Sequence, residues 1–149
     1  MKKEKAFTLI ELLVVMAIIA LLTVFLAASI MLIKARVQDT RIMAEISQIR
    51  KVAELMEKSS ESYENLCDDG NLLNKDEPIY GNELARLEDD IKVRQGGNLD
   101  LNCQASKVSY CLDVNLMASG SGRYCIDDEG HSIITTENFT CSTATTTCQ

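Results

Sequence analysis

The pattern of apolar and polar positions divides the chain into stretches of different periodicity. No charged side chain occurs from Leu12 to Ile33, and as a helix this run extends roughly 33 Å, at about 1.5 Å per residue. The hydrocarbon core of a bilayer is about 30 Å thick, so the run is long enough to cross it. We predict that residues 7–33 form an apolar helix that spans a membrane.

The helical pattern continues beyond this run, but on one face only. Charged residues such as Arg50, Lys51 and Glu54 separate apolar positions that recur every four and three residues. These apolar positions are Ile42, Ile46, Ile49, Ala53 and Met56. Neither Pro nor Gly occurs from Phe7 to Ser59, so both halves should form one helix of roughly 80 Å, at about 1.5 Å per residue. Its amphipathic half, residues 34–59, needs a small domain to cover the apolar stripe.

Residues 60–106 are expected to form a connecting loop that contains one short helix. The polar clusters Ser59–Ser62 and Asp68–Asn71 indicate the end of the long helix and the start of a loop. The spacing of Leu84, Leu87 and Ile91 predicts a short surface helix that ends before Gly96 and Gly97.

The period changes to two in the last region, residues 107–149. One face of the first predicted strand carries Val108, Tyr110, Leu112, Val114 and Leu116, and the other carries Ser109, Cys111 and Asp113. This pattern indicates a half-buried strand. Two further strands, Arg123–Asp127 and His131–Thr136, would complete an antiparallel meander, followed by a Thr-rich tail that offers little core. The predicted fold class is therefore α+β, with a long N-terminal helix packed on a small antiparallel sheet.

Six cysteines follow the apolar run, which favours disulfides and an extracytoplasmic position for the C-terminal part. Basic residues flank the run on both sides, so the positive-inside rule alone does not decide the orientation. The polar faces of two predicted strands carry Cys111 and Cys125, which suggests a cross-strand disulfide. In the tail, Cys141 would pair with Cys148. By elimination Cys67 would pair with Cys103, although other pairings remain open.

Charge and composition argue against several classes of function. Lys and Arg total 15 against 22 for Asp and Glu, and the resulting net charge of -7 disfavours generic nucleic-acid binding. A single histidine and no Gly-rich phosphate loop give no catalytic constellation, so neither an enzyme nor a cofactor is expected. The cysteine spacing lacks the pattern of a zinc site. Oxygens of Asp127, Asp128 and Glu129 could bind calcium, but this run, followed by Gly130, favours a hairpin turn.

The segment from Ala6 to Val15, AFTLIELLVV, resembles the N-terminal signature of type IV prepilins and pseudopilins. A short basic leader, a Phe, a Glu five residues into the mature chain and a long apolar helix occur in the family's order. The resemblance implies that residues 1–6 are a leader and that prepilin peptidase cuts between Ala6 and Phe7 and methylates the Phe7 amine. The chain departs from the usual pattern at Ala6, where Gly is common, and at Ala28, where many members have Pro.

Glu11 is the candidate assembly residue. An ionisable group inside an apolar segment is costly without a partner, and cleavage would create a cationic amine at Phe7. The resemblance implies that the Glu11 carboxylate pairs with the Phe7 amine of a neighbouring subunit in a filament.

The resemblance also implies partners and a location. Expected partners are prepilin peptidase, an inner-membrane assembly platform, membrane lipid before assembly, and copies of the chain or related pilins. The precursor would cross the inner membrane once with its head outside the cytoplasm, and would then enter a pilus or pseudopilus. Three functions remain open: a structural subunit of a type IV pilus, a pseudopilin of a type II secretion or DNA-uptake system, and a bitopic membrane protein with an extracytoplasmic binding head.

Overall fold

The computed structural model describes residues 8–118, 120–135, 141 and 147–148. This part of the chain forms two helices and an antiparallel sheet with the strand order β1-β2-β3-β4. The elements are α1 (Leu9–Ser60), α2 (Gly81–Arg94), β1 (Leu101–Ala105), β2 (Tyr110–Asn115), β3 (Arg123–Asp127) and β4 (Ser132–Thr135). The predicted α+β class is confirmed. The chain divides into two compact units, Met1–Ala35 and Arg36–Gln149.

In the first unit, the described residues of α1 expose their apolar side chains. Leu9 is 84% exposed and Leu22 is 58% exposed. The window Leu9–Leu26 has a mean hydropathy of 2.9, and none of it is buried within the chain. By length and composition, this part of α1 can cross a membrane.

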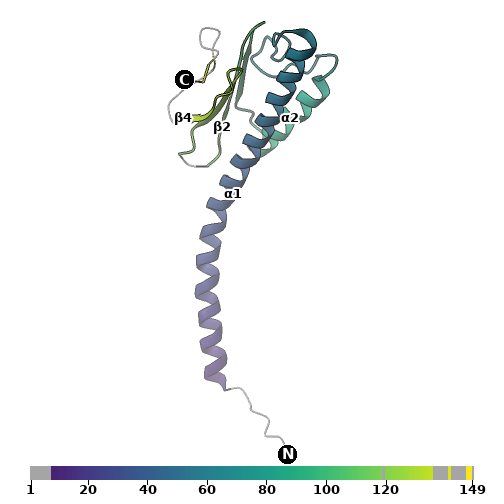
Figure 1. Cartoon of the computed structure of the whole chain (residues 1–149). Coiled ribbons are helices and arrows are strands. Elements are labelled where there is room, and N and C mark those ends of the chain that lie inside the picture. Colours follow the sequence, from purple (N-terminus) through teal and green to yellow (C-terminus); the bar gives the residue numbers. More distant parts are fainter. Residues whose placement is uncertain (1–7, 119, 136–140, 142–146, 149) are drawn as a thin grey trace, which may run out of the picture. The chain divides into compact units, whose positions relative to one another are not determined.

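The core of the second unit forms around the apolar stripe of α1. Ile42, Ile46 and Ile49 are fully buried, as the spacing of the stripe predicted. The sheet and α2 lie beside this part of α1 (Figure 1), and the same cluster contains Leu84, Leu87, Ile91, Tyr110, Leu112 and Val114. Each large apolar side chain buried here contributes about 1.5–3 kcal/mol. The short helix predicted from Leu84, Leu87 and Ile91 is α2.

Strand β1 lies where the sequence predicted only loop and helix. It pairs with β2 in antiparallel register, with Leu101 opposite Val114 and Ala105 opposite Tyr110. Five residues give too short an alternation to distinguish a strand from a loop, and β1 is defined by its pairing with β2. The prediction that residues 60–106 form a connecting loop with one short helix was therefore wrong at residues 101–105.

Strand β2 also begins later than predicted. Val108 is 77% exposed and belongs to the hairpin turn between β1 and β2. Ser106 and Ser109 hold this turn, since the amide of Ser109 donates to the Ser106 hydroxyl oxygen at 3.1 Å. The strand is not half-buried, because residues 110–114 are buried on both faces.

Polar side chains form hydrogen bonds to the loops that connect the helices and strands of the second unit. The carboxylate of Asp39 on α1 accepts the backbone amides of Met117 and Ala118, at the start of the β2–β3 connection. At the end of α2, the side-chain nitrogen of Gln95 donates to the carbonyl of Asn115 at 2.8 Å, and its oxygen accepts the Asp100 amide at 2.8 Å. Backbone groups of these connections thus find partners where no regular ladder reaches them.

Gly81, the first residue of α2, has no room for a side chain. An added Cβ would lie 2.3 Å from the carbonyl oxygen of Lys75. We expect Gly81→Ala to lower the free energy of unfolding by about 1–3 kcal/mol, because the backbone of the preceding loop must move. Urea unfolding of the full chain in detergent, followed by circular dichroism, would measure the change. The exposed neighbour Asn82 gives the control, since Asn82→Ala should change stability by less than about 0.5 kcal/mol. Equal stability of both variants would contradict the packing described.

Candidate processing and assembly site

The first turn of α1 is closed by a reciprocal interaction between Thr8 and Glu11. The Thr8 amide and hydroxyl donate to Glu11 Oε2 at 2.9 and 2.7 Å. In return, the Glu11 amide approaches the Thr8 hydroxyl oxygen at 3.4 Å. Thr8 is thus the N-cap of a capping box and Glu11 its third helical residue. The carboxylate therefore has a role inside one chain, as a stabiliser of the helix start.

Sequence reasoning singled out Glu11 but missed Thr8. The signal was present, since Thr-x-x-Glu before an apolar run is the sequence pattern of a capping box. Ala6 and Phe7, the predicted cleavage and methylation residues, lie outside the described residues. The Phe7–Glu11 charge pair therefore stays a prediction.

All six cysteines form disulfides. Cys67 is joined to Cys103, the pair that sequence reasoning reached by elimination. The other two pairings differ from the prediction. The structure joins Cys111 to Cys141 and Cys125 to Cys148.

The register of the sheet explains why Cys111 and Cys125 are not bonded to each other. Cys111 lies opposite Asp127, and Cys125 lies opposite Asp113, so the two cysteines are diagonal neighbours. Diagonal positions are about 7–8 Å apart, beyond the Cα separation of about 4.4–6.8 Å that a disulfide spans. The two bonds to the tail have Cα separations of 5.7 and 5.8 Å.

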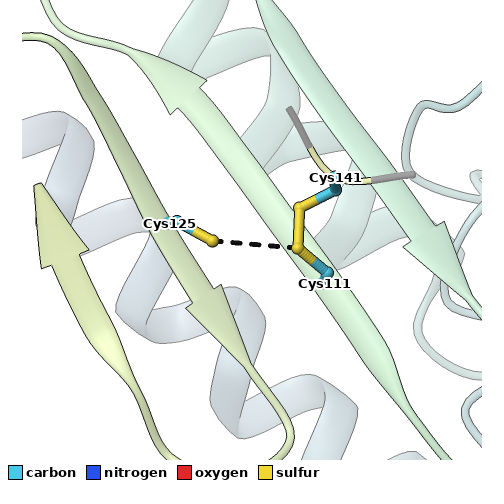
Figure 2. A group of neighbouring side chains, drawn as sticks. All are labelled: Cys111, Cys125 and Cys141. Carbon is cyan, nitrogen blue, oxygen red and sulfur yellow. Dashed lines mark hydrogen bonds between the residues drawn. A yellow bond between two sulfur atoms is a disulfide. The ribbon is translucent and has the colours of Figure 1, made fainter. Parts of the chain in front are cut away.

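Cys141 and Cys148 of the tail therefore lie against the face of the sheet that was predicted to be polar. Cys111, Cys125, Cys141 and Cys148 are all buried and form a cluster of their own. The sulfurs of Cys111 and Cys125 approach to 3.7 Å (Figure 2). Because both sulfurs are already in disulfides, they carry no thiol proton and meet in van der Waals contact. The expectation of a tail with little core was wrong for its described residues.

Asp127, at the end of β3, holds Cys148 of the tail by a hydrogen bond. Its Oδ2 accepts the Cys148 amide at 2.8 Å, and lies 2.8 Å from Nδ1 of His131. Its Oδ1 accepts the His131 amide at 2.8 Å. Burial alone would raise the pKa of Asp127, but hydrogen bonds from the Cys148 amide and from the ring and amide of His131 outweigh it and lower the pKa.

The acidic run after β3 forms a turn that is held to α1. Asp127 is occupied by the donors just described, and Asp128 Oδ1 accepts the Tyr110 amide at 3.2 Å. Arg50 on α1 donates to the carbonyl oxygens of Gly130 and His131. These contacts form the hairpin turn that the sequence favoured, with oxygens of Asp127 and Asp128 accepting donors of the protein.

A second buried carboxylate, Asp113, lies on β2 beside the tail. It accepts Nη2 of Arg123 at 3.2 Å, while Nη1 of Arg123 reaches Asp100 at 2.8 Å. The Cys141 amide also donates to Asp113, at 3.4 Å. Burial raises the pKa of Asp113, although Arg123 and the Cys141 amide act in the opposite direction.

The lowered pKa of Asp127 predicts a pH-dependent contribution to stability. This contribution is present above the unfolded-state pKa of about 3.9 and is lost as the pH falls through the lower pKa of the folded state. Asp127→Asn should lower the free energy of unfolding by about 1–3 kcal/mol at pH 7, because an amide matches these donors poorly. Urea unfolding at several pH values should show this difference shrinking in acid.

Exposed Asp69 provides the control, since Asp69→Asn should leave the free energy of unfolding unchanged at every pH measured. A deficit of Asp127→Asn that stays constant down to strongly acidic pH would contradict the role of the ionised carboxylate.

Comparison with known proteins gives a family match for the N-terminal region. The model of the prokaryotic N-terminal methylation motif matches residues 1–27. This motif implies processing by prepilin peptidase and assembly with other pilins, and its family is structural. No curated protein and no solved structure matches the chain.

The match covers the segment in which Thr8 and Glu11 close the first turn of an exposed apolar helix. Together with that helix, the motif indicates membrane anchoring. The N-terminal region of this chain carries the type IV prepilin-like signature, that of a pilin-like or pseudopilin precursor.

Proposed function

We propose that the chain is a structural subunit of a type IV pilus or pilus-like filament. Prepilin peptidase would cut it between Ala6 and Phe7 and methylate the Phe7 amine. The first half of α1 would then assemble with the same half of neighbouring copies. The observation that carries this proposal is the apolar helix Leu9–Leu26, none of which is buried and which begins at the third residue after the predicted cleavage site.

The exposed apolar surface of the first half of α1 suits both the membrane-stored subunit and the assembled subunit. Before assembly, lipid would cover the first half of α1, and the head would lie outside the cytoplasm, where disulfides persist. After extraction from the membrane, neighbouring helices would replace lipid around about the same apolar area. The subunit would thus work only as part of an oligomer.

Glu11 would change its role during assembly. In the single chain it accepts two hydrogen bonds from Thr8, both on Oε2. A carboxylate has two oxygens and can accept further donors, so it can also receive the Phe7 amine of a neighbour. A charge pair of this kind in an apolar surrounding would set the axial register of the filament.

A pseudopilin of a type II secretion or DNA-uptake system is the second candidate. It shares every N-terminal feature just described. The three disulfides of the second unit favour a filament that is exposed at the cell surface, because they resist unfolding there. Deleting the gene and scoring surface filaments against protein secretion and DNA uptake would separate the two functions.

The charge of Glu11 can be tested without destroying the helix start. A glutamine still accepts hydrogen bonds in a capping box, so Glu11→Gln should leave the chain folded and in the membrane. We expect the yield of filaments to fall by more than about tenfold, since removing one partner of a buried ion pair leaves the other charge unpaired and costs about 3–5 kcal/mol, and about 1.4 kcal/mol is already tenfold. Filaments sheared from cells and quantified by immunoblot give the measurement.

Glu54→Gln is the matched control, because it makes the same change at an exposed position of the same helix outside the apolar half. It should assemble normally. A normal yield of filaments from Glu11→Gln would contradict the assembly role of this carboxylate.

A further inference from the structure

The exposed charges of the second unit are divided between its two ends. This unit begins at Arg36, within α1, and the loop that follows α1 lies at the opposite end of the unit (Figure 1). Residues 57–69, in the last turn of α1 and this loop, contain five carboxylates and one lysine. Residues 36–41 contain two arginines and Asp39, whose carboxylate is buried and accepts two backbone amides. We call residues 36–41 the basic end and residues 57–69 the acidic end.

The two arginines of the basic end, Arg36 and Arg41, are exposed. Within the part of the chain that the structure describes, neither guanidinium has a hydrogen bond or an ion pair. The other four arginines of the second unit all bond to groups of the same chain; they are Arg50, Arg86, Arg94 and Arg123. A guanidinium carries five N–H donors in a fixed fork that suits carboxylates. Arg36 and Arg41 are therefore available to an acidic partner.

The acidic end presents exposed carboxylates beside a polar hollow. Glu64, Asp68 and Asp69 line this hollow, which has a volume of about 350 Å³. Asp68 is occupied in part, because its Oδ1 accepts the amides of Gly70 and Leu72. Among the described residues, no donor bonds to the carboxylates of Glu64 and Asp69. These two carboxylates can accept a cationic side chain of a partner.

We propose that the acidic end of one copy binds the basic end of the next copy, with Arg36 and Arg41 of one chain against Glu64 and Asp69 of the other. This inference rests on the filament role proposed above and names a contact between the second units. One chain cannot pair its own two ends, because the helix from Arg41 to Ser60 is about 30 Å long, at about 1.5 Å per residue. Two different surfaces that bind each other make a heterologous contact, and such contacts build open helical filaments when they do not close into a ring.

A second copy fits the charges of both ends better than an anionic lipid surface does. Lipid headgroups could neutralise Arg36 and Arg41, but they would leave Glu64 and Asp69 unpaired. A second copy supplies the opposite sign at each end. Exposed ion pairs are individually weak, but opposite charges that meet across an interface fix its orientation and register. The same contact is repeated at every junction of a filament.

Charge reversal at each end tests the contact. The variants are Arg36→Glu/Arg41→Glu, Glu64→Lys/Asp69→Lys and the combination of all four substitutions. We expect each double variant to lower the yield of filaments about three- to tenfold, because like charges then meet at every junction. The combined variant should return to the wild-type yield, since its two ends again carry opposite charges. Filaments sheared from cells and quantified by immunoblot give the yields.

Lys51→Glu is the control, because Lys51 is exposed on α1 between the two ends. It should assemble normally. Before the yields are compared, the intact mass without reduction should show that every variant keeps its three disulfides.

Two results would overturn the contact while wild-type filaments form. One is a normal yield from both double variants. The other is a combined variant as defective as the double variants, which is the result expected if the arginines bind lipid. Failure of the wild-type chain to form filaments would instead contradict the filament role itself, and the contact with it.

Discussion

The exposed apolar surface of the first half of α1 is the constraint on which the rest of the structure depends. Within the part of the chain that the structure describes, nothing covers the side chains from Leu9 to Leu26, and exposing each large one to water costs about 1.5–3 kcal/mol. This surface is suited to membrane anchoring, and we propose that neighbouring helices replace lipid around it in a filament. The same helix supplies the stripe from Ile42 to Met56 to the core of the second unit. One uninterrupted helix thus serves two environments, and the capping box of Thr8 and Glu11 fixes where it starts.

The second unit is held by polar and covalent links as well as by its apolar core. Asp39, Asp113 and Asp127 are buried carboxylates that accept backbone amides from connections or from the tail. Each carboxylate accepts hydrogen bonds from a different segment of the chain. These hydrogen bonds hold that segment against a helix or strand. Two disulfides then bond Cys141 and Cys148 to neighbouring strands, so these two residues of a tail that seemed peripheral by composition are buried against the sheet.

The sequence predicted the elements that have a local periodic pattern, and it missed those that depend on pairing between residues far apart in the chain. The long helix and α2 follow from periodic patterns such as Ile42, Ile46 and Ile49, which extend over several turns. Strand β1 could not be predicted, because its five residues acquire strand geometry by pairing with β2. The pairing of Cys111 with Cys141 depends on a register that sets Cys111 opposite Asp127, which no local pattern reveals. At the candidate site, Glu11 was predictable from its charge, and Thr8 was predictable from its spacing but was overlooked.

The mass of the mature N-terminus in native membranes or filaments tests the central claim most directly. If α1 begins as a processed assembly helix, mass spectrometry will find a chain that starts at Phe7 and carries a methyl group on its amine. A chain that retains Met1, or one that starts near Ser29 after cleavage as an ordinary secretory signal, would contradict the account.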